Sequence, residues 1–184
     1  MSTRFNWQTI SSEQIADCRV FSVNRNLAAP SGSENAHHFY VLHPANWVNV
    51  IPITENNEVV LIEQFRHGTA QLTLEIPGGM IDLNDPSPRH AAAREMLEET
   101  GYEGNELIHI GRNHPNPALQ SNYCDTFLAR DVKPILKPSF DRNEYCEIRL
   151  TPIDKIPLLI QSGRITHALV IVAFYYLHLH ELSR

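Results

Sequence analysis

The sequence has few cysteines, no excess of basic residues and no long hydrophobic run. Its three cysteines, Cys18, Cys124 and Cys146, are odd in number and too widely spaced for a disulfide framework or a zinc site. A formal net charge of −6 argues against a protein that binds nucleic acid by neutralising phosphates. The most apolar stretch, residues 168–177, is too short to cross a bilayer, and the start of the chain lacks the apolar core of a secretory signal. We therefore expect a cytoplasmic protein with neither nucleic-acid nor membrane partners.

The length and composition are those of a globular protein with one main domain. The 184 residues are 42% apolar and 20% charged, and they contain no internal repeat. The strand pattern is weaker in residues 1–45 than in the rest of the chain, and the candidate strands there are 18–26 and 37–42. Two strands could hardly fold alone. We expect residues 1–45 to form an N-terminal β extension and residues 46–184 to form the main domain.

The remaining pattern predicts many strands and few helices. Residues 48–53 and 59–65 predict a hairpin, and residues 72–76 alternate as a third strand. Further predicted elements are strands at 106–111, 123–130 and 145–150, a short helix at 154–161 and a longer one at 166–182. Strands and helices do not alternate regularly, which indicates an α+β protein and not a doubly wound sheet.

The most strongly predicted element is a helix that begins near residue 88. Residues 91–99 are almost all good helix formers, and Pro88 suits an opening turn. Either Asp85 or Ser87 can cap its start, and Gly101 can end it in a left-handed conformation.

Three carboxylates lie on one face of this helix. Glu95, Glu98 and Glu99 have i, i+3, i+4 spacing, so they repel one another unless a cation lies between them. Hard divalent cations such as Mg²⁺ or Mn²⁺ prefer carboxylate oxygens. The alternative is a solvated acidic face that Arg94 partly neutralises. The Pro-Gly-Gly sequence at 77–79, where backbone can approach a ligand closely, favours the metal site.

Residues 79–102, GMIDLNDPSPRHAAAREMLEETGY, resemble the signature of Nudix hydrolases. The REMLEETG core is highly specific, but the sequence departs from the signature in two ways. Asp85 stands where the pattern has Glu, and eight residues instead of seven separate it from Arg94. In the family this first acidic residue supports the loop and helix through the arginine, so the role of Asp85 is open.

The resemblance extends beyond the signature. LIEQFRHGTAQLTLEIPGGMID is similar to the ADP-ribose and nucleoside-diphosphate-sugar pyrophosphatase branch of the family, and Pro117 lies sixteen residues past Gly101, as in ADP-ribose hydrolases. The resemblance implies a Nudix fold, in which a mixed β-sheet lies between α-helices. It also implies a homodimer, in which the N-terminal extensions complete each other's substrate pockets.

The resemblance implies a set of metal ligands and catalytic residues. The metal ligands would be the Gly78 carbonyl and the side chains of Glu95, Glu98, Glu99 and Glu144, of which Glu98, Glu99 and Glu144 would also act in catalysis. In some relatives an acidic residue two positions before Glu144 is the general base. Arg142 occupies that position here, so Glu144, Glu98, Asp141 and Glu147 all remain candidates.

Three further residues are predicted to bind substrate. Arg66 matches an arginine that contacts the phosphates, and a guanidinium fork suits diphosphate oxygens. Glu75 would bind a substrate hydroxyl or brace its loop. Trp47 would stack on a nucleobase or simply pack against neighbouring side chains.

The implied reaction is Mg²⁺-dependent hydrolysis of the diphosphate bond of ADP-ribose or a related nucleoside diphosphate sugar, with Mn²⁺ as the other metal. The products would be a nucleoside monophosphate and a sugar phosphate. One alternative is a nucleoside triphosphate pyrophosphatase, against which the extension and the QFRHG to LEIPGG stretch argue. The other is a non-catalytic module that senses a nucleotide sugar, which we would expect to lack some of the three helix glutamates.

Overall fold

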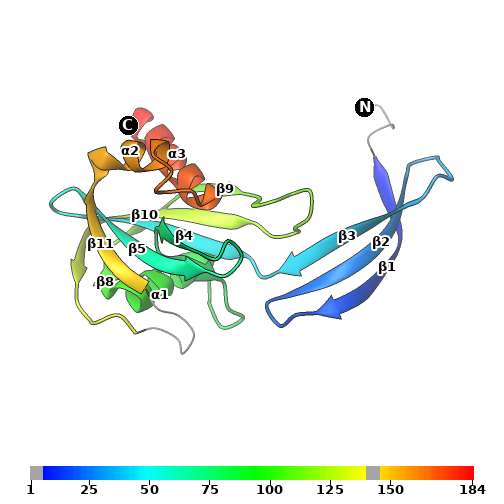
Figure 1. The fold of residues 1–184 in the computed structure, drawn as a ribbon, viewed down its shortest axis with the longest axis horizontal. Coiled ribbons are helices and arrows are strands. Elements are labelled where there is room, and N and C mark those ends of the chain that lie inside the picture. The colour runs from blue at the N-terminus through cyan, green and yellow to red at the C-terminus, as the bar shows by residue number, and fades with distance from the viewer. Residues whose placement is uncertain (1–5, 140–145) are drawn as a thin grey trace. The chain divides into compact units, whose positions relative to one another are not determined.

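The computed structural model describes residues 6–139 and 146–184, and the chain divides into two compact units (Figure 1). One unit, called here the extension unit, takes the chain up to Ala45 together with His114–Tyr123. The other, called the main unit, contains Asn46–Asn113 and Cys124–Arg184.

The extension unit is an antiparallel sheet of three strands in the order β1-β2-β3. Its strands are β1 (Trp7–Asp17), β2 (Phe21–Pro30) and β3 (His37–Pro44). The prediction of two strands was therefore wrong. β1, WQTISSEQIAD, was missed because every one of its residues is exposed, so no buried face imposes an apolar alternation on it.

The main unit contains eight strands, in the path β11-β5-β4-β10-β8. Off this path, β6 pairs with β5, β7 pairs with β4, and β9 pairs with β10. The pairing of β4 with β10 is parallel. The predicted hairpin is confirmed, since β4 and β5 are antiparallel neighbours. The strands are β4 (Trp47–Thr54), β5 (Glu58–Arg66), β6 (Gln71–Glu75), β7 (Gly78–Met80), β8 (Tyr102–Glu103), β9 (Leu107–Asn113), β10 (Cys124–Pro134) and β11 (Cys146–Pro152).

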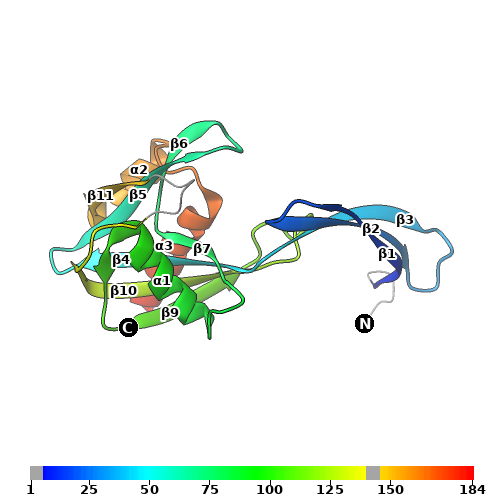
Figure 2. The same ribbon diagram turned by 90° about the horizontal axis from the view of Figure 1, so that it is seen from below.

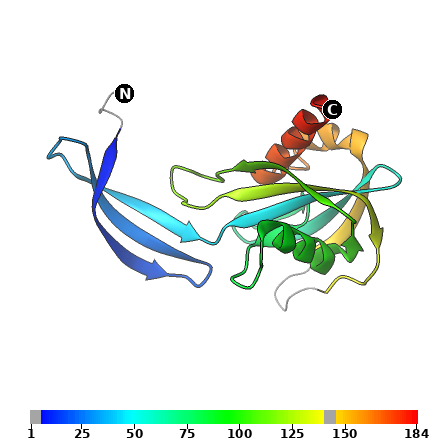
Figure 3. The same cartoon turned by 180° about the vertical axis from the view of Figure 1, so that it is seen from behind.

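Helices cover both faces of this sheet (Figures 2 and 3). They are α1 (Pro88–Thr100), the 3-10 turn η2 (Ile153–Lys155), α2 (Ile156–Gln161) and α3 (Ala168–Leu182). Successive residues of β4 alternate between two cores. Val50 packs with Met96 of α1, whereas Ile51 packs with Ala173 of α3. The predicted α+β architecture, a mixed sheet between helices, is confirmed. In the described parts of the chain, no helix combines the length and the apolarity that a bilayer crossing requires.

Local signals in the sequence explain where α1 begins and ends. Of the two predicted caps, Ser87 is the one used, because its hydroxyl accepts the His90 backbone N–H at 3.2 Å. Gly101 adopts φ 71°, and its N–H donates to the Leu97 carbonyl at 2.8 Å. These two ends fix which side chains of α1 face β7.

Candidate active site

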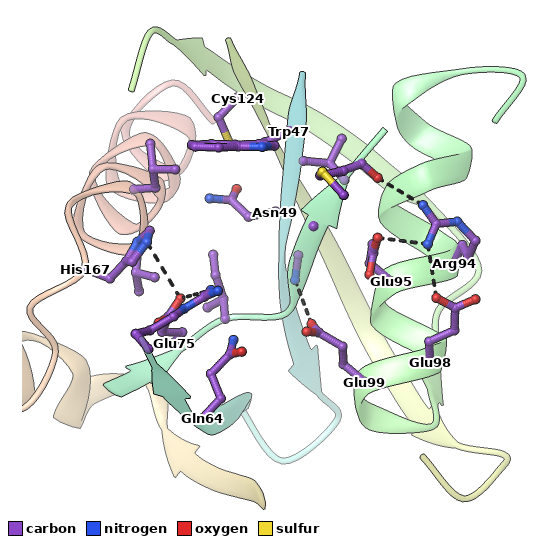
Figure 4. Close-up of a pocket in the computed structure, with 18 of the residues that line it drawn as sticks. Trp47, Asn49, Gln64, Glu75, Arg94, Glu95, Glu98, Glu99, Cys124 and His167 are labelled. Carbon is purple, nitrogen blue, oxygen red and sulfur yellow. Dashed lines mark hydrogen bonds and ion pairs between the residues drawn. The ribbon is translucent and has the colours of Figure 1, made fainter. Parts of the chain in front are cut away.

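A cavity of about 510 Å³ opens in the main unit between α1, β4, β6, β7 and the segment before α3 (Figure 4). Seven of the predicted site residues line it, whereas Glu147, a candidate general base, is not among the lining residues. Glu144, Asp141 and Arg142 lie outside the described residues. The residues brought together are Trp47, Arg66, Glu75, Gly78, Glu95, Glu98 and Glu99.

The acidic face of α1 borders this cavity, and its carboxylates are hydrogen-bonded. Arg94 Nη1 donates to Glu95 Oε1 at 2.8 Å and to Glu98 Oε2 at 3.1 Å. Glu99 is only 6% exposed, and its Oε2 accepts the Gly78 N–H at 2.8 Å. Within residues 6–139 and 146–184, no three His, Cys, Asp or Glu side chains are placed to share one metal ion. In this conformation an arginine and a backbone amide compensate the negative charge.

Asp85 anchors Arg94 on the side away from the glutamates. The guanidinium donates from Nη2 to Oδ2 at 2.9 Å and from Nε to Oδ1 at 3.3 Å. The Asp82 N–H donates to the same carboxylate at 2.9 Å. Arg94 holds the pKa of Asp85 far below its usual range against the opposing effect of burial, and Asp85 in turn raises the pKa of Arg94. An aspartate in a loop longer by one residue can therefore hold the arginine.

Two glycines allow β7 to approach both β4 and α1 closely. A Cβ on Gly78 would collide with the Val48 carbonyl oxygen, and one on Gly79 would lie 2.5 Å from Glu95 Oε1. The Glu95 carboxylate thus occupies the space that a side chain at residue 79 would fill. Carboxylates beside a glycine backbone form a set of hard oxygen donors, which fits a divalent cation such as Mg²⁺ or Mn²⁺.

Arg66 and Glu75 form a two-pronged ion pair on another wall of the cavity. Arg66 Nε and Nη2 donate to the two Glu75 oxygens, each at 2.8 Å, and Thr73 Oγ1 donates to Oε1 at 2.6 Å. Burial would raise the pKa of Glu75, which is 2% exposed, but the bonds and charge of Arg66 keep it below the usual value. Of the two predicted roles of Glu75, the contacts correspond to bracing.

Sequence reasoning missed several polar residues of the cavity, among them Asn49 and His167. Asn49 interrupts the apolar run of β4, and this interruption was the available signal. His167 immediately precedes α3 and was one of many histidines without ligand spacing. Burial lowers the pKa of His167, which favours a neutral imidazole near pH 7.

Comparison with known proteins gives consistent matches. The NUDIX domain model matches residues 43–172. An ADP-ribose pyrophosphatase of Bacillus subtilis (strain 168) is 27% identical over 176 residues, 95% of this chain and 94% of that protein. A methanol dehydrogenase activator of Bacillus methanolicus is 29% identical over 183 residues, 98% of this chain and 97% of its own length. The crystal structure of an ADP compounds hydrolase superposes with a TM-score of 0.85 at 22% identity, over 97% of this chain and 95% of that one.

Proposed function

Because this chain belongs to the NUDIX domain family, we propose that it hydrolyses the diphosphate bond of ADP-ribose or a related nucleoside diphosphate sugar. The products are a nucleoside monophosphate and a sugar phosphate. The observation that carries the proposal is the cavity, which gathers the acidic face of α1, the two glycines of β7 and Arg66 in one place. The ADP-ribose pyrophosphatase of Bacillus subtilis, which aligns over nearly the whole chain, supports this substrate class.

Nudix hydrolases generally use divalent metal ions, and we propose Mg²⁺, with Mn²⁺ as a substitute. Glu95, Glu98, Glu99 and the Gly78 carbonyl would hold it, together with Glu144, which lies outside the described residues. When bound, the metal would neutralise the diphosphate and lower the pKa of the attacking water.

The chain's own residues supply positioning and proton transfer. Arg94 orients Glu95 and Glu98, and Arg66 is placed to exchange Glu75 for diphosphate oxygens. Among the described candidates for the general base, Glu98 lines the cavity and its side chain is 47% exposed. Glu147 is not among the residues that line the cavity, so we propose as the base Glu98, or else Glu144 or Asp141, which lie outside the described residues.

We also propose that the protein is a cytoplasmic homodimer joined through the extension unit. Supporting this, Trp7, Phe39 and Tyr40 of that unit are 43–52% exposed, which leaves apolar surface open on its sheet. Cys18 and Cys124 form no disulfide within the described residues, as a reducing compartment would keep them. Light scattering tests the dimer, and a monomer at micromolar concentration would contradict it.

A substrate panel tests the activity. ADP-ribose, GDP-mannose, UDP-glucose, NADH, dinucleoside polyphosphates and nucleoside triphosphates are incubated with Mg²⁺, Mn²⁺ or EDTA, and the phosphate-ester products are identified. We expect EDTA-sensitive release of a monophosphate from ADP-ribose or another nucleotide sugar. Cleavage of triphosphates alone would instead assign a triphosphate pyrophosphatase. Binding of a nucleotide sugar without turnover would assign a sensing module.

A further inference from the structure

The cavity has a second end, separate from the acidic face of α1, where uncharged polar side chains lie beside the Arg66–Glu75 ion pair. Figure 4 shows the Trp47 indole, the Asn49 amide and the His167 ring around this end, with Glu95, Glu98 and Glu99 across the cavity. Asn49 is 6% exposed, and its Oδ1 has no hydrogen-bond partner among the described residues. The buried Nδ1 of His167 likewise lacks a partner there.

Unpartnered polar atoms are costly in a folded protein, and here two of them border one cavity. Asn49 shares one face of β4 with Ile51 and Ile53, which are both buried in the core under α3, so packing alone would favour an apolar residue there. His167 is the N-cap residue of α3, but its side chain makes no capping hydrogen bond. Its Nε2 lies 3.9 Å from Glu75 Oε2, too far for a hydrogen bond. Neither side chain has a structural role that explains its polarity.

We propose that Asn49 and His167 form a specificity-determining pair that binds hydroxyl groups of a sugar ring of the substrate, with Trp47 against the ring's apolar face. This inference rests on the proposed function. A hydroxyl both donates and accepts, so it can donate to the Asn49 amide oxygen and pair with a neutral imidazole in either tautomer. Neither the Asn49 amide nor a neutral His167 ring carries a charge, which suits a neutral ring better than a phosphate as the partner of these two side chains.

Two sugars could supply these hydroxyls, the ribose of the nucleoside and the terminal sugar. Binding is therefore measured by calorimetry in EDTA, so that turnover does not interfere, with ADP-ribose, AMP and ribose 5-phosphate as separate ligands. Asn49→Val and His167→Phe should each weaken ADP-ribose binding about tenfold or more, because the hydroxyl would lose its partner. The same variants should weaken the binding of only one of the two fragments, AMP or ribose 5-phosphate. The fragment that is affected contains the sugar that the pair contacts.

A deoxy analogue tests the hydroxyl directly. The wild-type protein should bind ADP-ribose more tightly than the analogue that lacks a hydroxyl on the identified sugar, and each variant should bind the two about equally. The matched controls are Thr126→Val and His180→Phe, which remove unpartnered buried polar atoms of residues that do not line the cavity. Both controls should bind ADP-ribose as the wild type does.

Stability separates a binding role from a structural one. Asn49→Val should melt at the wild-type temperature or above it, because it replaces an unpartnered polar group with an apolar one of similar size. A lower melting temperature with unchanged hydroxyl discrimination would assign Asn49 a structural role and overturn the inference.

The remaining outcomes separate this inference from the proposed function. If the wild type binds ADP-ribose more tightly than its deoxy analogue but never cleaves ADP-ribose, the proposed activity is wrong and the role of Asn49 and His167 in binding stands. Cleavage with neither variant affected would refute the pair and leave the activity. If the variants lose discrimination between nucleobases while they still discriminate the hydroxyl, the pair reads the base and the sugar assignment is wrong. No binding of any nucleotide sugar would refute both.

Discussion

Replacing Asp85 with Asn should destabilise the protein and impair catalysis through Arg94. The Asp85 side chain is 3% exposed, and its carboxylate accepts from two guanidinium nitrogens and one backbone N–H and also contacts His90 Nδ1 at 3.0 Å. Asparagine keeps the shape but presents an N–H₂ group to one of those donors and removes the charge. Arg94 would then be freer to move, and it is the residue that holds Glu95 and Glu98.

The expected loss of unfolding free energy is about 2 kcal/mol. Breaking a fully buried ion pair costs about 3–5 kcal/mol. The Asp85 loop lies at the surface, with Asp82 62% exposed, so solvent screening reduces that cost. For a chain of this length, about 2 kcal/mol corresponds to a fall of about 4–8 °C in melting temperature. Outer contacts that orient metal ligands typically contribute about 10–100-fold to activity, and we expect kcat to fall in that range.

Thermal and urea denaturation followed by circular dichroism measure the stability, and initial rates measure kcat. Asp82→Asn is the matched control, because Asp82 Oδ2 faces the same Arg94 at 3.7 Å but is exposed. We expect this control to stay within about 0.5 kcal/mol of the wild type. If Asp85→Asn is no less stable and no slower than Asp82→Asn, the proposed support of the carboxylates by Arg94 is wrong.

The pH dependence of this loss has a definite sign. The folded-state pKa of Asp85 lies below its unfolded value of about 3.9. The stabilisation is therefore complete above that value and disappears as the pH falls toward the folded pKa. The difference between wild type and Asp85→Asn should shrink as the pH falls below about pH 4. A difference that grew as the pH fell would contradict the assignment.

Two further substitutions test other parts of the structure. Gly79→Ala should lower kcat about 100-fold, because its Cβ would displace the Glu95 carboxylate from 2.5 Å away; unchanged initial rates would contradict this close approach. Asp125→Asn should lower the unfolding free energy by about 2–3 kcal/mol in urea titration, because Asp125 is 1% exposed and accepts from Arg112 at 2.8 Å and from His109 at 2.7 Å. KM should not change, because Asp125 is not among the residues that line the cavity. A changed KM with unchanged stability would show that this cluster belongs to the site instead.

Elements with local signals could be predicted from the sequence. The helix α1 has a serine cap, a proline in its first turn and a terminal glycine, and each of these acts within a few residues. β1 has no such signal. Its 11 residues are all exposed, and its polar side chains pair with β2, as in the bond of 2.7 Å between Ser12 Oγ and Asn26 Oδ1. A strand that buries neither face leaves no periodic pattern in the sequence.

The same distinction applies to the site. The acidic face followed from helix spacing, and the structure places Glu95, Glu98 and Glu99 on one cavity as that spacing predicts. The end with Asn49 and His167 depends on tertiary packing that brings β4 beside the residue before α3, and sequence spacing does not encode that meeting. Asn49 alone is marked in the sequence, as a polar residue in the apolar run of β4, but its pairing with His167 could be recognised only in the folded chain.

The central claim is that the acidic face of α1 supports metal-dependent cleavage of a nucleotide sugar. The most direct test is the initial rate of AMP release from ADP-ribose as Mg²⁺ is titrated, for the wild type and for Glu99→Gln. The account predicts a saturable Mg²⁺ dependence that EDTA abolishes, together with the loss of nearly all turnover in a Glu99→Gln variant that remains folded. Release of AMP without metal, or undiminished turnover by Glu99→Gln, would contradict it.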